Sequence, residues 1–170
     1  MSQKKHTPRL DLPGIPDVRF HYVRRDKPEH HRLREVFDHH VREAFRRHLA
    51  ADCREELIAG GLTEPQISRL ADGLSVEGYN VHHKHPLDDS GTNDFSNLVL
   101  MDLDSHKELH LRVDPQIGRL ERGQQATIRM PVPAGSVYVH PSKIRQPDRS
   151  RRQDGPEEEI GNLHRKEFVR

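Results

Sequence analysis

One segment of the sequence, residues 79–111 (YNVHHKHPLDDSGTNDFSNLVLMDLDSHKELHL), constrains the fold more than any other. It opens with a run of strand length, residues 79–83, whose alternate side chains face opposite sides. Pro86 cannot continue a strand ladder, and residues 88–94 are rich in turn formers. An apolar run of strand length, residues 98–101, follows. This order predicts a hairpin of two strands joined by a loop.

A helix is expected directly after the second strand. Asp104 or Ser105 is a suitable N-cap, and Glu108 would complete a capping box with Ser105. His106 and His110 are four residues apart in that helix, so both imidazoles lie on one face. The segment therefore predicts a strand–strand–helix unit with histidines on its first strand and on its helix.

The histidines of this unit suit a metal centre. A pair four residues apart, such as His106 and His110, can hold one divalent ion from a single helical turn, and His82 can add a third nitrogen from the strand. Three neutral imidazoles leave a coordination position open, which is typical of catalytic sites. His83 faces away from His82 along an ideal strand, so it is free to act as a base near neutral pH. His85 is a further candidate in the same segment.

The segment resembles the HNH nucleases, also called the ββα-metal superfamily, and most of all the nuclease domains of antibacterial toxins such as the DNase colicins. The resemblance covers about a fifth of the chain and rests on four matches in order and nearly in spacing: Val81-His82-His83, Pro86-Leu87, Asn97-Leu98-Val99 and His106-x3-His110. It implies three metal ligands, a general base, and a residue that ties the loop to the base strand. These are His82, His106 and His110, then His83, then Asn97.

The activity that the resemblance implies is metal-dependent hydrolysis of DNA phosphodiester bonds, leaving 5′-phosphate and 3′-hydroxyl ends. Contacts to phosphate carry no sequence information, and no base-reading helix is evident, so little sequence specificity is expected. The cofactor is one divalent metal ion. Nitrogen ligands favour Zn, Ni or Co over Mg or Mn by affinity, and which of these ions supports turnover stays open. Lys84, Lys107 and Arg112 beside the motif are candidate nucleic-acid-binding residues.

Two other interpretations use the same residues. A structural zinc site has four protein ligands. His85 could join the three candidate metal ligands in such a site, and the protein would then be a non-catalytic, zinc-stapled nucleic-acid-binding module. Pro86 and the alternation of the strand argue against an inward His85. The second alternative keeps the chemistry of the motif and changes the substrate to RNA.

The likeness to toxins has implications for the whole protein. It implies an antibacterial effector, colicin-like or cargo of a type VI secretion system, with a cognate immunity protein that is acidic opposite the basic residues beside the motif. Such an effector is made in the cytoplasm, exported by a specialised secretion system and active in the cytoplasm of the target cell. Residues 1–10 are polar and basic, with no signal-peptide core, and no apolar run has the length of a membrane span. No membrane partner is therefore expected.

Composition limits what else the chain can be. Hydrophobic and charged residues each make up 32% of the 170 residues, so the core is small and the surface highly charged. The formal net charge is only +1, so any attraction to nucleic acid must come from local patches. Cys53 is the single cysteine, which excludes an intrachain disulfide and a cysteine-ligated zinc site.

The remaining segments complete an α+β fold, in which N-terminal helices pack on the ββα-metal motif and a short β strap and a disordered tail follow. Residues 1–28 are expected to be an extended leader, with a strand at residues 18–23. Residues 29–75 form the helical support region, and residues 76–140 form the nuclease core with its strap. Residues 141–170 are predicted to be a charged flexible tail.

Apolar residues at helical spacing predict a long helix at residues 29–51 of the support region, continued by residues 52–59. Thr63 caps a short helix at residues 64–71. The arginines of the long helix either form a solvated face paired with acids or contact phosphate. Arg46 and Arg47 are candidates for phosphate contact, because they lack nearby acids until Asp52.

Downstream of the motif, the helix that carries the histidine pair is expected to end near Asp114-Pro115, with one more turn after it. Residues 126–132 and 135–139 are strand-like but are broken by Pro131 and Pro133. They are predicted to form an edge hairpin or an extended strap.

Overall fold

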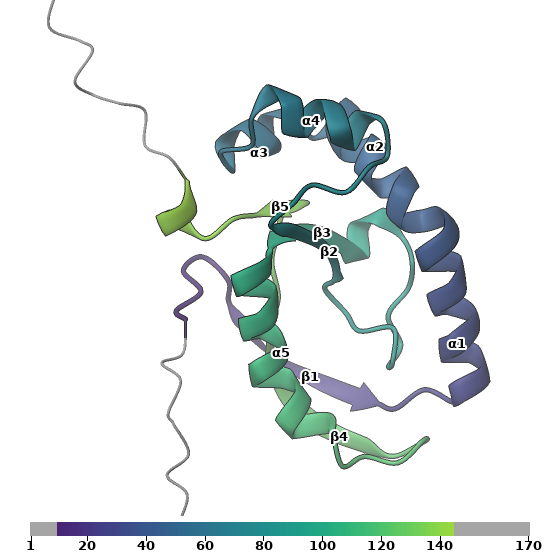
Figure 1. The fold of residues 1–170 in the computed structure, drawn as a ribbon. Coiled ribbons are helices and arrows are strands. Elements are labelled where there is room, and N and C mark those ends of the chain that lie inside the picture. Colours follow the sequence, from purple (N-terminus) through teal and green to yellow (C-terminus); the bar gives the residue numbers. More distant parts are fainter. Residues whose placement is uncertain (1–9, 145–170) are drawn as a thin grey trace, which may run out of the picture.

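The computed structural model describes residues 10–144 and has a mixed α+β fold, as predicted (Figure 1). The first nine residues of the predicted leader and residues 145–170 of the predicted tail lie outside the described part. Among the helices that are described, none is long and apolar enough to cross a membrane.

The strands form two small sheets. β1 (Asp17–Val23) pairs antiparallel with β4 (Gln125–Pro131), so distant parts of the chain lie side by side (Figure 1). β2 (Tyr79–His83) pairs antiparallel with β3 (Leu98–Asp102), which confirms the predicted hairpin. β3 also pairs in parallel with β5 (Val137–Tyr138) and is buried at every residue, because it is the central strand of its sheet.

The edge hairpin predicted for residues 126–132 and 135–139 is wrong, because β4 and β5 join different sheets. Pro131 has no N–H to continue the β4 ladder. The chain then crosses to the other sheet, where the Glu56 carboxylate accepts hydrogen bonds from the backbone N–H groups of Ser136 and Val137 at 2.9 and 3.2 Å. These bonds anchor β5 beside the helical region.

The described part of the predicted leader belongs to the folded body. Tyr22 of β1 is completely buried and packs with Ile128 and Met130 of β4. Leu12, ahead of the strand, is buried in a second small cluster that includes Leu109. The strand predicted at residues 18–23 is therefore confirmed, but residues 10–28 are not a solvated arm. They pack against β3 and the helix that follows it, through contacts of Leu10 and Leu12 with Val99, Met101 and Leu109.

The long predicted helix forms as α1 (Lys27–Val36) and α2 (Arg42–Asp52), joined without a break by a π-helical turn at Phe37–Val41. The π turn was not predicted. It changes the register of the apolar stripe, so that Phe37 is buried while Val36 is 39% exposed. The Asp26 side chain caps α1 by accepting from the Glu29 backbone N–H at 2.9 Å.

Two short helices follow. α3 (Arg54–Ala59) is separated from α2 at Cys53, so the predicted continuous extension is interrupted there. α4 (Glu64–Ala71) has the predicted bounds and begins with a capping box formed by Thr63 and Gln66. The main core lies between α2–α4 and the three-stranded sheet, and contains Phe45, Leu49, Leu57, Leu70, Val81, Leu98 and Leu100.

α5 (Leu103–Ile117) begins and ends differently from the prediction. Its N-cap is Asp102, whose carboxylate accepts from the Ser105 N–H at 3.0 Å, and not Asp104 or Ser105. The predicted capping box is also wrong, because Glu108 is buried and bonds to the Leu10 N–H instead. The helix continues through Pro115, which removes one N–H donor without ending it. Short 3₁₀ turns lie at Phe95–Asn97 and Pro141–Lys143.

Candidate metal centre

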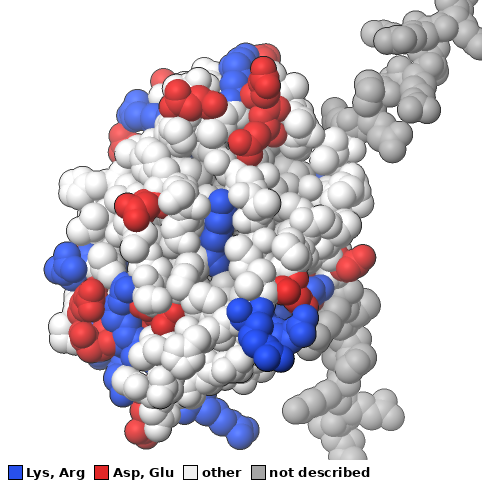
Figure 2. Space-filling model, turned by 180° about the vertical axis from the view of Figure 1, so that it is seen from behind, with Lys and Arg blue, Asp and Glu red and all other residues white. Residues whose placement is uncertain are grey.

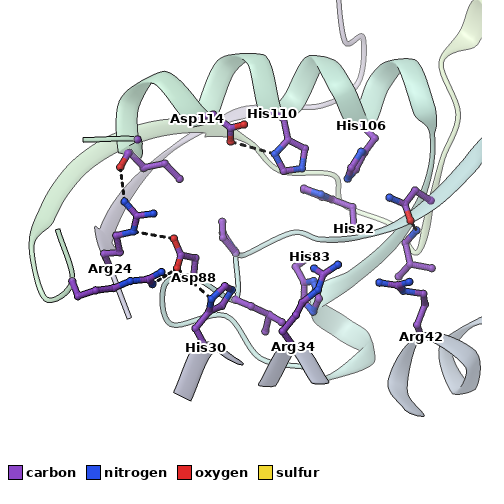
Figure 3. Close-up of a pocket in the computed structure, with 17 residues that line it drawn as sticks. Arg24, His30, Arg34, Arg42, His82, His83, Asp88, His106, His110 and Asp114 are labelled. Atoms are coloured by element: carbon purple, nitrogen blue, oxygen red, sulfur yellow. Dashed lines mark hydrogen bonds and ion pairs between the residues drawn. The ribbon is translucent and has the colours of Figure 1, made fainter. Parts of the chain in front are cut away.

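Three histidines from two elements converge in one place. His82 projects from β2, while His106 and His110 project from adjacent turns of α5 (Figure 3). One ring nitrogen of each lies within 4.8 Å of the other two. The ring centroids are 4.7 to 5.6 Å apart. In the described part of the chain, this is the only group of three or more histidine, cysteine or acidic side chains with ligand atoms gathered so closely.

The cluster is electrostatically suited to a cation. Burial lowers the pKa of His82 well below its usual value, and the nearby imidazoles of His106 and His110 lower it further. Burial also lowers the pKa of His106 to about 4, with a further contribution from His110. Both rings are therefore neutral at pH 7, which is the form that binds a metal ion.

An acidic side chain orients the third imidazole. His110 Nδ1 lies 3.2 Å from the Asp114 carboxylate, one turn further along α5 (Figure 3). A carboxylate can only accept, so Nδ1 carries the proton of the neutral ring and Nε2 keeps its lone pair. Carboxylate–histidine pairs of this kind commonly orient metal ligands. The three predicted ligands are thus together, and the donor set fits one divalent ion with an open coordination position.

His83 lies on the opposite face of β2 from His82, as the strand alternation predicted. It lines the same pocket, is 7% exposed, and packs against the Phe37 ring at 4.3 Å between centroids. Its Nε2 lies 3.0 Å from the Asn93 side-chain oxygen. Burial lowers the pKa of His83 to about 4, against a smaller opposing effect of the Asn93 bond, so this ring is also neutral at pH 7.

Asn97 holds the two ends of the loop together. Its side-chain oxygen accepts from the His85 N–H at 2.9 Å, and its NH₂ donates to the carbonyls of His85 and Thr92 at 2.9 and 2.8 Å. Its own carbonyl accepts from the Lys84 N–H at 2.8 Å. Asn97 does not line the pocket. It acts on the site by fixing the backbone that follows His83.

His85 is turned away from the metal cluster. Its Nε2 lies 2.7 Å from the buried Asp89 carboxylate, and its ring packs edge-on against Phe20 of β1 at 4.2 Å. Asp89 also accepts from the Val23 N–H at 2.6 Å, so these contacts attach the loop to β1. The alternative of a four-histidine zinc site is therefore wrong for this fold.

A pocket of about 540 Å³ opens beside the cluster, and four arginines line it: Arg24, Arg34, Arg42 and Arg122. Arg24 and Arg122 at one end are already occupied. Both pair with Asp88, Arg24 also donates to the Ile117 and Leu120 carbonyls, and Arg122 donates to the Arg25 carbonyl. Their contacts join β1, the loop and the end of α5, which favours a structural role.

Arg34 and Arg42 come from the helices across the pocket from α5 (Figure 3). Asp38 bonds to both of them, and both guanidinium groups lie over the Phe37 ring, at 5.3 and 4.7 Å. Arg42 Nε is buried and has no hydrogen-bond partner. Two guanidinium groups against one carboxylate leave one net positive charge. This pair therefore places net positive charge on the side of the pocket that faces the three histidines.

The predicted nucleic-acid-binding residues Lys84, Lys107 and Arg112 do not line this pocket. Arg112 instead pairs with Glu108 at 3.0 Å and donates to the Leu10 carbonyl at 2.8 Å, which holds residue 10 on α5. Lys84 donates to the Ala134 carbonyl at 3.2 Å, and Lys107 is exposed on α5. On the face shown in Figure 2, acidic and basic side chains are interspersed, without one continuous basic patch.

The arginine assignments from sequence were partly wrong as well. Arg46 and Arg47 donate to the carbonyls of Gly73 and Ala71, both at 3.2 Å, and so hold α2 against the end of α4. They are not part of the pocket. The sequence could have indicated that Arg34 and Arg42 lie together. Each is four residues from Asp38 in a predicted helix, so both side chains can reach its carboxylate, and both are close to Phe37.

Comparison of the sequence with known proteins identifies a relative. The chain is 31% identical over 128 residues to the uncharacterized protein YhhZ of Escherichia coli (strain K12). The match covers 75% of this chain and 32% of YhhZ, so the chain spans about a third of the length of this curated relative. No family model matches the chain, and no solved structure matches it significantly.

Proposed function

We propose that this protein is a metal-dependent endonuclease that hydrolyses DNA phosphodiester bonds with little sequence specificity. One observation carries the proposal: the imidazoles of His82, His106 and His110 and a fourth, that of His83, converge on one pocket whose facing side carries two arginines that share a single carboxylate. The order of β2, loop, β3 and α5, with histidines on the first strand and the helix, supports the resemblance to the ββα-metal nucleases.

His82, His106 and His110 would hold a single divalent ion. Such an ion, when bound, supplies Lewis-acid stabilisation of the negative charge on the reacting phosphate. Asp114 keeps the His110 ring in the orientation that presents Nε2 to the cluster. With only three protein ligands, a bound ion would remain able to interact with a substrate oxygen.

The other residues of the pocket would transfer a proton and bind the phosphate. His83 accepts a proton from the attacking water, and its burial against Phe37 keeps the ring fixed and neutral beforehand. Arg34 and Arg42 bind phosphate oxygens from the far side of the pocket, because two guanidinium groups that share one carboxylate leave a net positive charge that suits an anion. Phosphate contacts of this kind do not read base sequence.

Cleavage of supercoiled plasmid by metal-stripped protein tests the proposal, with divalent ions added back one at a time. We expect nicking that depends on added metal, stops with EDTA and is lost in His83→Ala. End analysis should give 5′-phosphate and 3′-hydroxyl products. A structured RNA in parallel reactions distinguishes the RNA-cleaving alternative. Absence of cleavage of either nucleic acid with every ion would refute the nuclease proposal and favour a non-catalytic binding module.

The role of the arginine pair has its own test. Binding of the inactive His83→Ala protein to DNA is measured at several salt concentrations, with Arg34→Gln or Arg42→Gln added. Each loss of a phosphate contact should weaken binding and reduce the slope of log K against log salt by about 0.9. Arg47→Gln is the matched control, since Arg47 is on the same helical rod but outside the pocket. Equal effects from the control would contradict the assignment.

The biological role follows from the resemblance and is likewise proposed. The domain would be the toxic part of an antibacterial effector, made in the cytoplasm, exported by a specialised secretion system and active in the target cytoplasm. Its immunity protein would present carboxylates to the pocket arginines, in place of Lys84, Lys107 and Arg112, because the arginines are where free positive charge faces the site.

A further inference from the structure

Asn93, in the loop between β2 and β3, bridges His83 and the first long helix. Its side-chain oxygen lies 3.0 Å from His83 Nε2, and its NH₂ group donates to the Leu33 carbonyl of α1 at 2.9 Å. Neither contact was predicted from sequence. The residue is separate from Asn97, which bonds only to the loop backbone.

The donors and acceptors in this chain of bonds fix the protons. A backbone carbonyl can only accept, so the end of the Asn93 amide that faces Leu33 must be the NH₂ group. The other end, facing His83 Nε2, is then the oxygen, which also only accepts. His83 Nε2 must therefore carry the proton of the neutral ring, and Nδ1 must carry the lone pair.

We propose that Asn93 is a positioning residue that holds His83 in the Nε2–H tautomer, so that Nδ1 is the nitrogen available to accept a proton. The bond to α1 makes this arrangement rigid. Leu33 is one helical turn before Phe37, and the Phe37 ring packs on His83 at 4.3 Å. The same helical segment thus fixes the amide that selects the tautomer and the ring that limits rotation of the imidazole.

The inference deepens the proposed nuclease function, since the use of Nδ1 as a base rests on that function. The tautomer itself does not depend on it. The metal ligands are on the other face of β2, so Asn93 should affect proton transfer without affecting metal binding. Loss of proton transfer with unchanged metal binding would therefore distinguish a positioning role for Asn93 from a general structural role, which would affect both.

Long-range nitrogen–proton NMR of the ¹⁵N-labelled, metal-free full chain at neutral pH tests the tautomer. The His83 signals are identified by their loss in His83→Gln. We expect a protonated Nε2 and an unprotonated Nδ1 in the wild type, with an Nε2–H proton that exchanges slowly because it is buried and bonded. In Asn93→Ala this proton should exchange rapidly. Asn93→Asp keeps an oxygen that can accept from Nε2 but loses the donor to the Leu33 carbonyl, so the proton should exchange more slowly than in Asn93→Ala and faster than in the wild type. A wild-type proton on Nδ1 would overturn the inference without any variant.

Kinetics test the positioning role. Asn93→Ala should lower kcat by about 10-fold or more, which is part of the roughly 10²–10⁴-fold that a positioned general base contributes, while KM and metal affinity stay within about 2-fold of wild type. Asn93→Asp should recover part of kcat. Thr92→Ala is the matched control from the same loop, because the Thr92 hydroxyl bonds only to Asp94 and Thr92 does not line the pocket. Unchanged kcat in Asn93→Ala, or an equal loss of metal affinity, would refute the positioning role. If the wild type cleaves no nucleic acid, the proposed function fails, and the NMR result still decides the tautomer.

Discussion

Replacing Asn97 with alanine should destabilise the protein more than most single asparagine substitutions. The side chain makes three hydrogen bonds to the loop backbone, at 2.8 to 2.9 Å, and they close the loop between the two strands of the hairpin. A typical intramolecular hydrogen bond contributes about 1 kcal/mol net, so loss of all three should lower the free energy of unfolding by about 3 kcal/mol.

Urea unfolding followed by far-UV circular dichroism measures this change. We expect a lower midpoint with an unchanged slope, because the loop is a small part of the surface exposed on unfolding. Asn80→Ala is the control, since it removes one hydrogen bond to the neighbouring residue and should lower the free energy by about 1 kcal/mol or less. A loss below about 1 kcal/mol in Asn97→Ala would show that water replaces these bonds and that Asn97 does not hold the loop.

Three further outcomes are expected. Burial alone would raise the pKa of Asp102, but hydrogen bonds from Ser105 and the His140 N–H outweigh it and hold the pKa below its usual value. The resulting stability is present above the unfolded pKa of about 3.9 and is lost as pH falls through the folded pKa. In Asp102→Asn, the free energy of unfolding should therefore fall less between neutral and acid pH than it does in the wild type. The same pH dependence in both proteins would contradict this prediction. Phe37→Leu should cost about 0.5–3 kcal/mol of stability, because a smaller side chain leaves part of a buried site unfilled. It should also lower plasmid cleavage by the folded protein, because the ring contact with His83 is lost; full activity would argue against the importance of that contact. Expression of the wild-type chain alone should be toxic to bacteria and His83→Ala should not, whereas harmless expression of a chain that cleaves DNA in vitro would count against the toxin role.

Local patterns predicted most of the site. The alternation of a strand was enough to place His82 and His83 on opposite faces, and the spacing of His106 and His110 placed them on one face of a helix. The loop between the two strands was also predicted correctly, because Pro86 and the turn formers after it cannot continue a strand. In each case the determining interaction is between residues close in sequence, so the sequence contains the whole signal.

Features that depend on distant contacts were not predictable in this way. Arg24 and Arg122 reach the pocket because β1 pairs with β4, and nothing near either residue indicates that pairing. The π turn at Phe37–Val41 has no simple sequence signature, yet it places Phe37 against His83. The strand was predicted at residues 98–101 and the N-cap of the helix at Asp104 or Ser105, whereas Asp102 is both the last residue of β3 and the N-cap of α5.

A metal titration tests the central claim most directly. Isothermal titration of the metal-stripped chain with Zn²⁺ or Ni²⁺ should give one ion per chain. Alanine at His82, His106 or His110 should each weaken binding by more than about 100-fold, since even residues that only orient a ligand cost roughly 10–100-fold. His85→Ala is the control from the same segment and should bind as the wild type does, because His85 faces Asp89. Wild-type affinity in any of the three ligand variants, or a comparable loss in His85→Ala, would contradict the three-histidine centre.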